Sequence, residues 1–518
     1  NGKTLVFSYV GYISQTITVG DKKVLDVKLL PNEKNALEEV SVVAFGTQKK
    51  ESVIGSITTV RPGDLKIPSS NLTASLAGRV AGVIAYQRSG EPGRDNADFF
   101  VRGITTFGAN TSPLILIDNV ELSTVDLARL QTDDIETFSI MKDATATALY
   151  GARGANGVIL VTTKKGVVGK ASISMRAETS ASGSTSDIAL ADPVTYMKQA
   201  NEAFATRDPL APLPYLEEKI ANTAAGVNPL VYPANDWRKM LFKDNAINQR
   251  YNLNVRGGGN IATYYVAGAY TKDNGVLNVD ERNNFNSNIS LKSYSLLTNV
   301  GINLTKSTLL NIKLSGNFDD YTGPLDGGAD MYNKVVHANP VRFPAYYPVD
   351  AAHQYVKHIM FGNDGENGAY LNPYADMVKG YRDESRSQML AQFELKQDLS
   401  AITEGLSVRA MVNLTRISSF GYRRLYNPFY YGLAGYDPLA DKYSISQINT
   451  TGTEYLGFAE DRKDLNSTFY LESMANYSRT FNKHAVSGLL VMIQREALTA
   501  NAGDLQQSLP GRNLGVSG

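Results

Sequence analysis

The stretch TLLNIKLSGNFDD, residues 308–320, decides the fold. From Leu310 to Phe318 every second position is apolar, apart from a glycine at 316, and the positions between them are polar or charged. A period of two places alternate side chains on opposite faces of a β-strand. The stretch therefore predicts a strand with one apolar face and one polar face.

The same alternation recurs along the chain after residue 170. Around Val408, for example, apolar residues at even positions alternate with Arg409, Asn413 and Thr415 at odd positions. Together these runs predict nine strands, near residues 171–179, 247–256, 261–272, 295–305, 308–319, 386–397, 405–418, 465–479 and 484–495.

The connections between these strands alternate strictly between long and short. The short ones lie near residues 257, 306, 398 and 481, and the long ones span about 181–246, 273–294, 320–385 and 419–464. A soluble sheet with one solvated face would explain the period of two. It would not explain why all the long connections lie at one end of the strands and all the short ones at the other. A transmembrane β-barrel has tight turns at one end, long loops at the other, apolar residues toward lipid and polar residues toward a wet lumen. We therefore expect a mainly β fold dominated by a transmembrane antiparallel β-barrel.

The number of predicted strands bears on whether the barrel is complete. Nine is odd, whereas bacterial single-chain barrels have even strand numbers. An open edge in lipid would leave backbone groups without partners. We expect the barrel to continue beyond Gly518 or to be completed by another polypeptide, and both ends of this sequence to be cuts in a longer protein.

Composition excludes several other classes of protein. Lys plus Arg and Asp plus Glu both number 51, so the chain has no basic surplus and we expect no nucleic-acid partner. No cysteine is present, which rules out disulfides and cysteine-ligated metals. No run approaches the roughly 18 consecutive apolar residues of a transmembrane helix.

The chain divides into four predicted regions. Residues 1–31 read as the end of a small β-sandwich, residues 32–50 as a linker, residues 51–166 as a compact α+β unit, and residues 167–518 as barrel. In the α+β unit, PLILIDNVEL predicts a hairpin that turns at Asp118 and Asn119. The linker contains EEVSVVAFGTQKK, residues 38–50, which is β-prone but has no obvious hairpin partner nearby. An unpaired strand in a linker calls for a partner from another chain.

The motifs place the chain in a known family. ALEEVSVVAFGTQKK, SLAGRVAGV, FFVRGITTFG, PLILIDNVEL, DDIETFSIMKDATATALYGARGANGVILVTTKKG and ANPVRFPAYYP resemble SusC-like TonB-dependent transporters of Bacteroidetes outer membranes. The resemblance runs from end to end of the chain. It implies a carboxypeptidase-regulatory-like β domain at 1–31, a plug at 51–166, and about nine of the 22 strands of the family's barrel.

The resemblance also implies what the protein does and where. It implies import of an oligomeric nutrient, usually a glycan and less often a peptide, across the outer membrane, with the N-terminal domains in the periplasm. The implied partners are outer-membrane lipid, a SusD-like surface lipoprotein that acts as a lid, and TonB, whose periplasmic domain adds a strand to a short segment of the linker. That segment, the TonB box, corresponds to Glu39, Val40, Ser41, Val42, Val43, Ala44, Phe45 and Gly46. The alternative is that Val40 to Phe45 extend the preceding β-sandwich.

Two further sets of residues are candidates for function. Arg79, Arg102 and Arg153 lie in the plug motifs and either pair with carboxylates of the barrel wall or pack within the plug. Aromatic residues in the long loops either contact the cargo and the lid or pack the loops together. The candidates for this rim are Tyr346, Tyr347, Tyr426, Phe429, Tyr430, Tyr431 and Tyr436.

No enzyme site is evident, and we expect no cofactor. His353 and His358 are five residues apart, which is not the spacing of a helical metal pair. The acidic, glycine-rich segment GNDGENG at 362–368 misses the spacing of a calcium loop, and a divalent cation bound there is a minor alternative to a solvated turn. Asp319 and Asp320 fix no acid–nucleophile separation for a glycosidase. A barrel-anchored enzyme or adhesin and a passive porin remain alternative functions.

Overall fold

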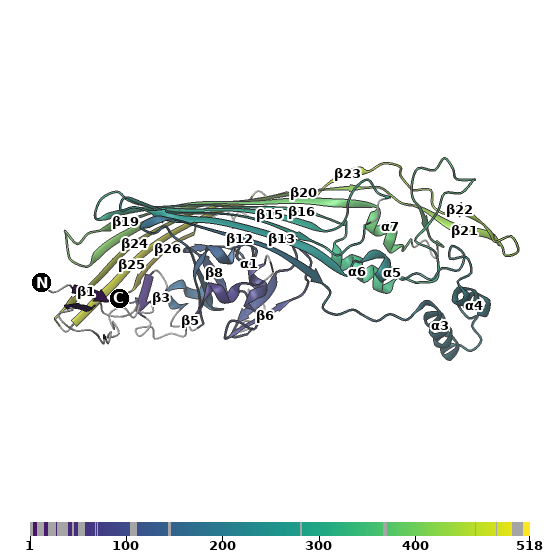
Figure 1. Ribbon diagram of the computed structural model, residues 1–518, viewed down its shortest axis with the longest axis horizontal. Coiled ribbons are helices and arrows are strands. Elements are labelled where there is room, and N and C mark those ends of the chain that lie inside the picture. Colours follow the sequence, from purple (N-terminus) through teal and green to yellow (C-terminus); the bar gives the residue numbers. More distant parts are fainter. Residues whose placement is uncertain are drawn as a thin grey trace.

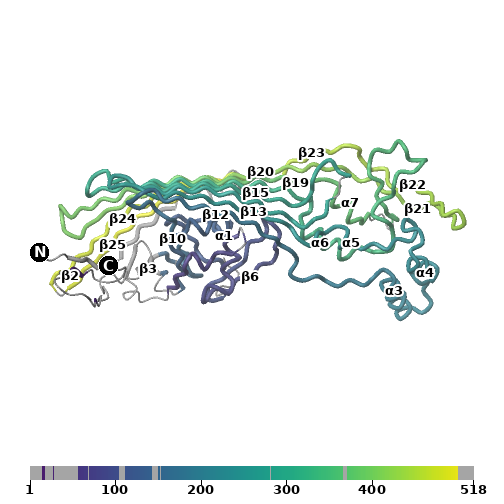
Figure 2. Tube along the Cα trace, in the orientation of Figure 1, coloured from purple at the N-terminus to yellow at the C-terminus, as the bar shows by residue number. Residues whose placement is uncertain are grey.

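A long twisted sheet, called the wall here, curves over a small α+β unit, called the plug (Figure 1). The computed structural model describes residues 4–7, 15–18, 27, 40–43, 46–49, 57–67, 69, 71–103, 111–142, 147–279, 282–365, 370–461, 463–482, 484–499 and 511–517. The long connections of the wall gather at one end and the short turns at the other (Figure 2). The plug lies against the concave face.

Ten long strands make up the path of the wall, and each pairs antiparallel with the next along the chain. The short strand β23 (Gly457–Glu460) also pairs with β20. Among the described residues no pairing joins β12 to β26, so these are the two edges of an open sheet. The strands are β12 (Gly169–Gly183), β13 (Asn245–Gly258), β14 (Ala262–Asn274), β15 (Ser290–Asn303), β16 (Thr308–Gly323), β19 (Gly380–Asp398), β20 (Leu406–Leu425), β24 (Asp464–Phe481), β25 (His484–Thr499) and β26 (Gly511–Ser517).

The nine predicted strands are confirmed, and most are longer than the alternating pattern indicated. The tenth, β26, was missed, so the argument from an odd strand count was wrong. The segment of β26 reads GRNLGVS, and its two glycines interrupt the apolar alternation that identified the others.

The long connections fold into short elements at one end of the wall. Helices α3 (Pro193–Arg207), α4 (Glu217–Ala225) and α5 (Trp237–Leu241) follow β12. Helix α6 (Gly328–His337), strands β17 (Tyr346–Tyr347) and β18 (Met360–Gly362) and helix α7 (Pro373–Val378) follow β16. Strands β21 (Phe429–Asp437) and β22 (Lys442–Gln447) follow β20 and complete a sheet of order β17-β18-β21-β22. Across the described residues, none of the helices is long and apolar enough to cross a membrane.

The plug is built on a five-stranded sheet of order β5-β10-β11-β8-β9. Its strands are β5 (Ile57–Val60), β8 (Leu114–Ile117), β9 (Val120–Glu121), β10 (Ile135–Met141) and β11 (Val158–Thr163). The predicted hairpin is confirmed: β8 and β9 are joined by Asp118 and Asn119, whose φ angles of 49° and 70° are those of a tight β-hairpin turn. The remaining plug elements are β6 (Val83–Gln87), β7 (Ala97–Val101), helix α1 (Thr124–Ala128) and the 3-10 helices Pro62–Leu65, Leu72–Leu76, Thr132–Asp134 and Ala148–Gly154.

Apolar side chains of this sheet and of the helices beside it form the core of the plug. Leu65, Leu76, Leu127, Phe138 and Ile140 are completely buried in one cluster. Helix α1 begins at a capping box in which Ser123 and Asp126 satisfy each other's backbone N–H groups. This cap fixes the start of a helix whose Asp126 faces the wall.

Two short hairpins precede the plug. Strand β1 (Thr4–Phe7) pairs with β2 (Gln15–Thr18), and residues 19–39, apart from Val27, lie outside the described residues. Strand β3 (Val40–Val43) pairs antiparallel with β4 (Gly46–Lys49), with Val40 opposite Lys49. The prediction that this strand has no partner in its own chain is therefore wrong. It was missed because GTQK carries no apolar alternation.

The outward face of the wall is apolar over most of its length. Leu253, Leu296, Met389 and Leu414 lie on it, each at least 49% exposed. An aromatic row crosses neighbouring strands nearer the loop end, where Tyr270 packs against Tyr251 and Tyr294 with ring centroids 6.3 and 5.1 Å apart. An apolar band bounded by aromatic residues is typical of a lipid-facing barrel surface.

The inward face differs from the prediction of a wet lumen. Asn413 is 0% exposed and Arg409 8%, and the plug lies on this face of the wall. The polar side chains of the alternating pattern are therefore mostly interface residues. For this part of the wall, the expectation of solvated lumen-facing positions was wrong.

Leu414→Arg tests the outward assignment. An arginine on the lipid face near the middle of a barrel strand costs about 2–4 kcal/mol of folding free energy. We expect a smaller folded fraction, measured by heat-modifiable mobility of membrane extracts, than for the apolar control Leu414→Phe. Equal folded fractions for the two variants would mean that Leu414 does not face lipid.

Candidate functional site

Charged side chains join the plug to the wall. The commonest arrangement is a plug carboxylate paired with a basic residue of a wall strand. The pairs are Asp118 with Lys313, Asp126 with Arg386 (2.6 Å), Glu121 with Arg495 (2.8 Å), Asp133 with Arg176 (2.7 Å) and Glu136 with Arg256 (3.8 Å). One pair has the opposite polarity: Arg129 Nε of the plug lies 3.0 Å from Asp319 Oδ2 of the wall, and both side chains are about nine-tenths buried.

Asp118 is largely enclosed between the plug and the wall. The β8–β9 turn aims its side chain toward β16, where it meets Lys313, and toward β11, where Thr163 donates its backbone N–H (2.8 Å) and its hydroxyl (2.7 Å). Burial by itself would raise the pKa of Asp118, but Lys313 and these hydrogen bonds together lower it below its ordinary value. Asp118 is therefore ionised and held by both the plug and the wall.

A second buried carboxyl lies two wall strands away. The Tyr265 hydroxyl on β14 donates to Asp134 Oδ1 at 2.7 Å, and Tyr265 is completely buried. Burial raises the pKa of Asp134 to about 6, against the opposing effect of this hydrogen bond. On β15, Asn299 Nδ2 donates to Thr163 Oγ1 (2.9 Å) and to the Lys164 carbonyl oxygen (2.6 Å). These contacts hold the end of the plug sheet against the wall.

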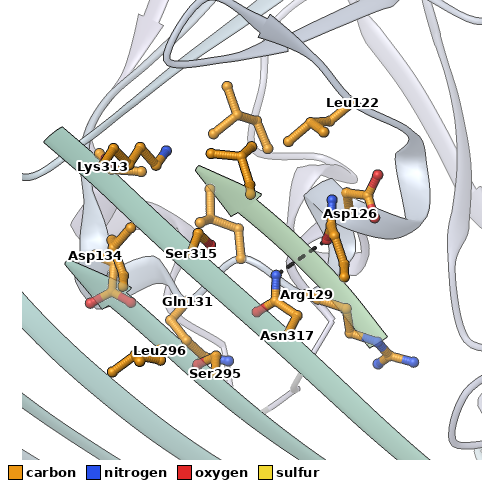
Figure 3. A pocket seen from close by; sticks show the side chains of 16 residues that line it. Leu122, Asp126, Arg129, Gln131, Asp134, Ser295, Leu296, Lys313, Ser315 and Asn317 are labelled. Carbon is orange, nitrogen blue, oxygen red and sulfur yellow. Dashed lines mark hydrogen bonds between the residues drawn. The ribbon is translucent and has the colours of Figure 1, made fainter. Parts of the chain in front are cut away.

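Cavities of about 10, 40 and 290 Å³ lie between the plug and the wall. Figure 3 shows the one of about 40 Å³, with Asp126, Arg129 and Asp134 of the plug facing Lys313 and Asn317 of the wall. The one of about 290 Å³ lies nearer the short turns. Its volume suits several waters, at about 30 Å³ each. It is lined mostly by polar side chains, among them Asn119, Thr162, Thr263, Asn299, Asn311, Gln392 and Glu394.

At the other end of the plug, Glu91 contacts the long loops. Its carboxylate accepts a hydrogen bond from the Tyr321 hydroxyl at the end of β16 (3.2 Å) and one from the Ala329 backbone N–H in the first turn of α6 (3.3 Å). A carboxylate at a helix N-terminus is stabilised by the helix dipole. Glu91 therefore links the plug to the loop that contains α6.

The loops themselves share a hydrophobic core, called the loop unit here. It includes Trp237 of α5, Met331 of α6, Phe361 of β18, Tyr374 of α7 and Tyr430 of β21. Lys334 of α6 bridges Asp326 and Asp376 at 2.7 and 2.9 Å, so α6 and α7 are also joined by charge. Residues from the connections after β12, β14, β16 and β20 thus form one unit.

The predicted rim aromatics belong to this packing. Tyr347, Tyr430 and Tyr431 are buried, at 4%, 6% and 3% exposed, so in this arrangement they pack the loops rather than offer a surface. Phe429 stacks on His358 with ring centroids 3.8 Å apart. Tyr346, Tyr426, Phe429 and Tyr436 are half-buried. The prediction that these residues contact cargo or a lid stays a prediction for those four alone.

The predicted plug arginines form local contacts instead of wall contacts. Arg79 donates to the Asp64 carbonyl oxygen within the plug, and Arg153 pairs with Glu121, also in the plug. For these two residues the described contacts favour the alternative of packing within the plug, and pairing with carboxylates of the barrel wall stays a prediction. Arg102 has a positive φ of 60°, and its partner falls outside the contacts described. The ion pairs that the structure does show between plug and wall are mostly the other way round: the acidic residue is on the plug and the basic residue is on the wall.

The structure describes the other predicted sites only in part. Glu39, Ala44 and Phe45 of the TonB box lie outside the described residues, and Val40 to Val43 form β3. In the segment 362–368, Asp364 pairs with Arg342, while Glu366 to Gly368 lie outside the description. Over the described ranges, no three His, Asp or Glu side chains are grouped so that they could hold a metal. Asp319 pairs with Arg129 whereas Asp320 accepts from Ser385 (3.0 Å), so these two carboxylates do not face a common substrate.

Comparisons with known proteins agree with this arrangement. The TonB-dependent Receptor Plug Domain family matches residues 49–158. TonB-dependent receptor P26 of Formosa agariphila is 29% identical over 397 residues, which cover 75% of this chain and 36% of that protein. TonB-dependent receptor SusC of Bacteroides thetaiotaomicron is 30% identical over 299 residues, covering 56% and 28%. A structure of the RagAB peptide importer in the open-open state has a similar fold, with a TM-score of 0.65 and 18% identity over 92% of this chain and 53% of that one.

A plug docked on the concave face of such a wall defines a plugged β-barrel of the outer-membrane type. More narrowly, the chain carries the plug domain of TonB-dependent receptors and is similar to SusC-like members of this family. Members of this family are outer-membrane barrels and not enzymes. The chain spans 36% and 28% of the length of the two curated relatives named above. The predicted domain boundaries stay predictions.

Lys313→Met tests whether the buried pairs hold the plug. It leaves Asp118 ionised and buried without its cation, and breaking a buried pair in this way destabilises by about 3–5 kcal/mol. We expect faster hydrogen exchange in β8 and β11 and a lower denaturant midpoint. The double variant Asp118→Asn/Lys313→Met removes both charges and should recover much of the loss, since Asn tolerates a positive φ. Equal stability of the single and the double variant would contradict this role.

Asp134→Asn tests the second buried carboxyl through pH. The pKa of Asp134 is raised from 3.8 to about 6 in the folded protein. Between these values the folded state binds more protons than the unfolded state, so the wild type loses stability as pH rises through this window. Two pKa units correspond to about 3 kcal/mol. We expect the stability difference between wild type and Asp134→Asn, measured by denaturation from pH 4 to pH 7, to shift by this order. Parallel pH profiles would show that Asp134 titrates normally.

Proposed function

We propose that the protein imports an oligomeric nutrient across the outer membrane, driven by TonB. The observation that carries this proposal is the docked plug. Its acidic side chains are paired with basic side chains on five different wall strands, so nothing passes unless the plug moves. Breaking the enclosed pairs, such as Asp118 with Lys313, leaves charges without partners, and an external pull would supply that work. A passive porin would have no use for such an arrangement.

The site of the pull is the segment Glu39 to Gly46. Its strand β3 already pairs with β4 on one edge. TonB therefore either adds to the other edge of β3 or displaces β4, and in both cases backbone hydrogen bonds supply the grip. The plug follows directly along the chain, so tension on β3 is transmitted to the plug sheet through β5.

We propose an oligosaccharide as the cargo and an oligopeptide as the alternative. The SusC-like character of the chain favours the first, and the fold shared with a peptide importer supports the second. Both are rich in hydroxyl or amide groups, which match the polar lining between plug and wall. A SusD-like lipoprotein seated on the loop unit would close the outer end. The N-terminal hairpins and the plug would face the periplasm.

Replacing residues 39–46 by a Gly/Ser segment of equal length tests the proposal. The replacement keeps the tether length but removes the β-prone strand, so uptake of labelled oligomer should be lost. Surface level and cargo binding should be unchanged, because the plug and the loop unit are untouched. The matched control Val42→Ile keeps the strand and should import normally. Uptake at the wild-type rate by the replaced protein would refute coupling through this segment.

A further inference from the structure

Plug contacts are unevenly distributed over the wall. Strands β12 to β19 and β25 each contribute at least one side chain that bonds or pairs with the plug. Between these groups, β20 and β24 contribute Arg409, Met411, Asn413, Thr415 and Glu472 to the concave face. None of these five forms a hydrogen bond or ion pair with the part of the plug that the structure describes. We call this stretch of the wall the seam.

The seam is nevertheless covered. Met411 and Asn413 are 0% exposed and Glu472 is 1% exposed. Gln392, on the neighbouring strand β19, donates both to the Asp118 carbonyl oxygen at the plug turn (3.4 Å) and to Met411 Sδ (3.1 Å). The plug turn therefore reaches the edge of the seam, and the two surfaces meet there without polar bonds.

The charges of the seam are neutralised within the wall itself. Arg409 lies between Glu394 of β19 (3.3 Å) and Glu472 of β24, and the Tyr470 hydroxyl donates to Glu472 at 2.7 Å. Glu394 also accepts from Asn311 Nδ2 at 2.8 Å. Elsewhere the wall uses such side chains to bind the plug. At the seam they are already satisfied by one another.

This difference decides where the interface separates most easily. Parting the plug from β12 to β19 leaves buried charges without partners, which is strongly unfavourable. Parting it from the seam breaks no ion pair between the described residues. It also brings water to Arg409 Nε and Asn413 Nδ2, two buried nitrogen atoms that have no hydrogen-bond partner in the described structure. Burial without a partner is costly, so hydration of these groups favours the open form.

We propose that the plug separates from the wall along the seam and that cargo crosses there, an inference that rests on the proposed import function. The cavity of about 290 Å³ borders this route, because Gln392 and Glu394 line it. A path that joins the cavity to the seam is lined by carboxylates, a guanidinium, amides and a tyrosine hydroxyl. Such a lining exchanges hydrogen bonds with an oligomer rich in hydroxyl or amide groups and rejects an apolar one. The plug would swing toward β12–β19 and stay attached to them. It would also release β25, where the pair of Glu121 with Arg495 is more than 30% exposed on both side chains and so costs less to break than a buried pair.

Single cysteines test where the interface opens, because the chain has no cysteine of its own. Thr415→Cys lies in the seam and Ala267→Cys lies on the pinned side, next but one to Tyr265; both positions are buried, at 6% and 2% exposed. In the purified protein without TonB, N-ethylmaleimide should label Thr415→Cys at least tenfold faster than Ala267→Cys. Asn413→Cys is a second seam variant in case the first folds poorly. Equal labelling rates, or faster labelling at Ala267→Cys, would contradict the proposal that the interface opens along the seam.

The same variants in cells separate this inference from the proposed function. With TonB energised and cargo present, labelling of Thr415→Cys should rise several-fold, and the rise should disappear when residues 39–46 are replaced. Ala267→Cys should stay protected. If both cysteines become labelled together, the plug leaves the wall as one body and the route along the seam is wrong. If the wild type imports nothing, the proposed function is wrong. The ratio of the two labelling rates in the purified protein still tests whether the interface opens along the seam.

Discussion

The pairing of buried charges between two separate bodies is the constraint on which this structure depends. Asp118 on the plug and Lys313 on the wall are 195 residues apart in sequence and are joined in the interior. Neither charge is stable there alone, since desolvation of an isolated ion costs several kcal/mol. The pair therefore makes docking of the plug a condition for burying either group. The same holds for Arg129 with Asp319, where both side chains are about nine-tenths buried.

This constraint explains why the wall strands alternate as they do. The outward positions are apolar because they form a continuous exposed face with residues such as Leu296 and Leu414. The inward positions are polar because they meet a plug whose own surface is polar, and a sheet buried on both faces would otherwise read as continuously apolar. The period of two therefore reflects two different environments. The outward side chains form an apolar surface suited to lipid, and the inward side chains face a folded domain.

The periodicity of the sequence was enough to predict the wall and its facing, since both depend on local alternation. It was not enough to predict β26, where two glycines interrupt the pattern, or the pairing of β3 with β4, whose residues Gly46 to Lys49 carry no apolar signal. Lys313 and Asp319 could be placed on the inward face of β16, but their partners on the plug depend on how two bodies dock. The partners of the plug arginines could not be predicted either, because they also depend on the folded structure. Arg79 and Arg153 contact acceptors within the plug, which no spacing along the chain reveals.

The contact at Glu91 limits how the plug moves. Glu91 binds Tyr321 on β16 and the first turn of α6, both on the pinned side of the wall. A plug that left as one body would have to break this contact and expose the end of α6, whose far side is packed into the loop unit. A plug that swings away from β20 and β24 keeps it, because the hinge and Glu91 lie on the same side. The loop unit could then stay closed over the outer end of the barrel while the route opens beneath it, which prevents a continuous pore across the membrane.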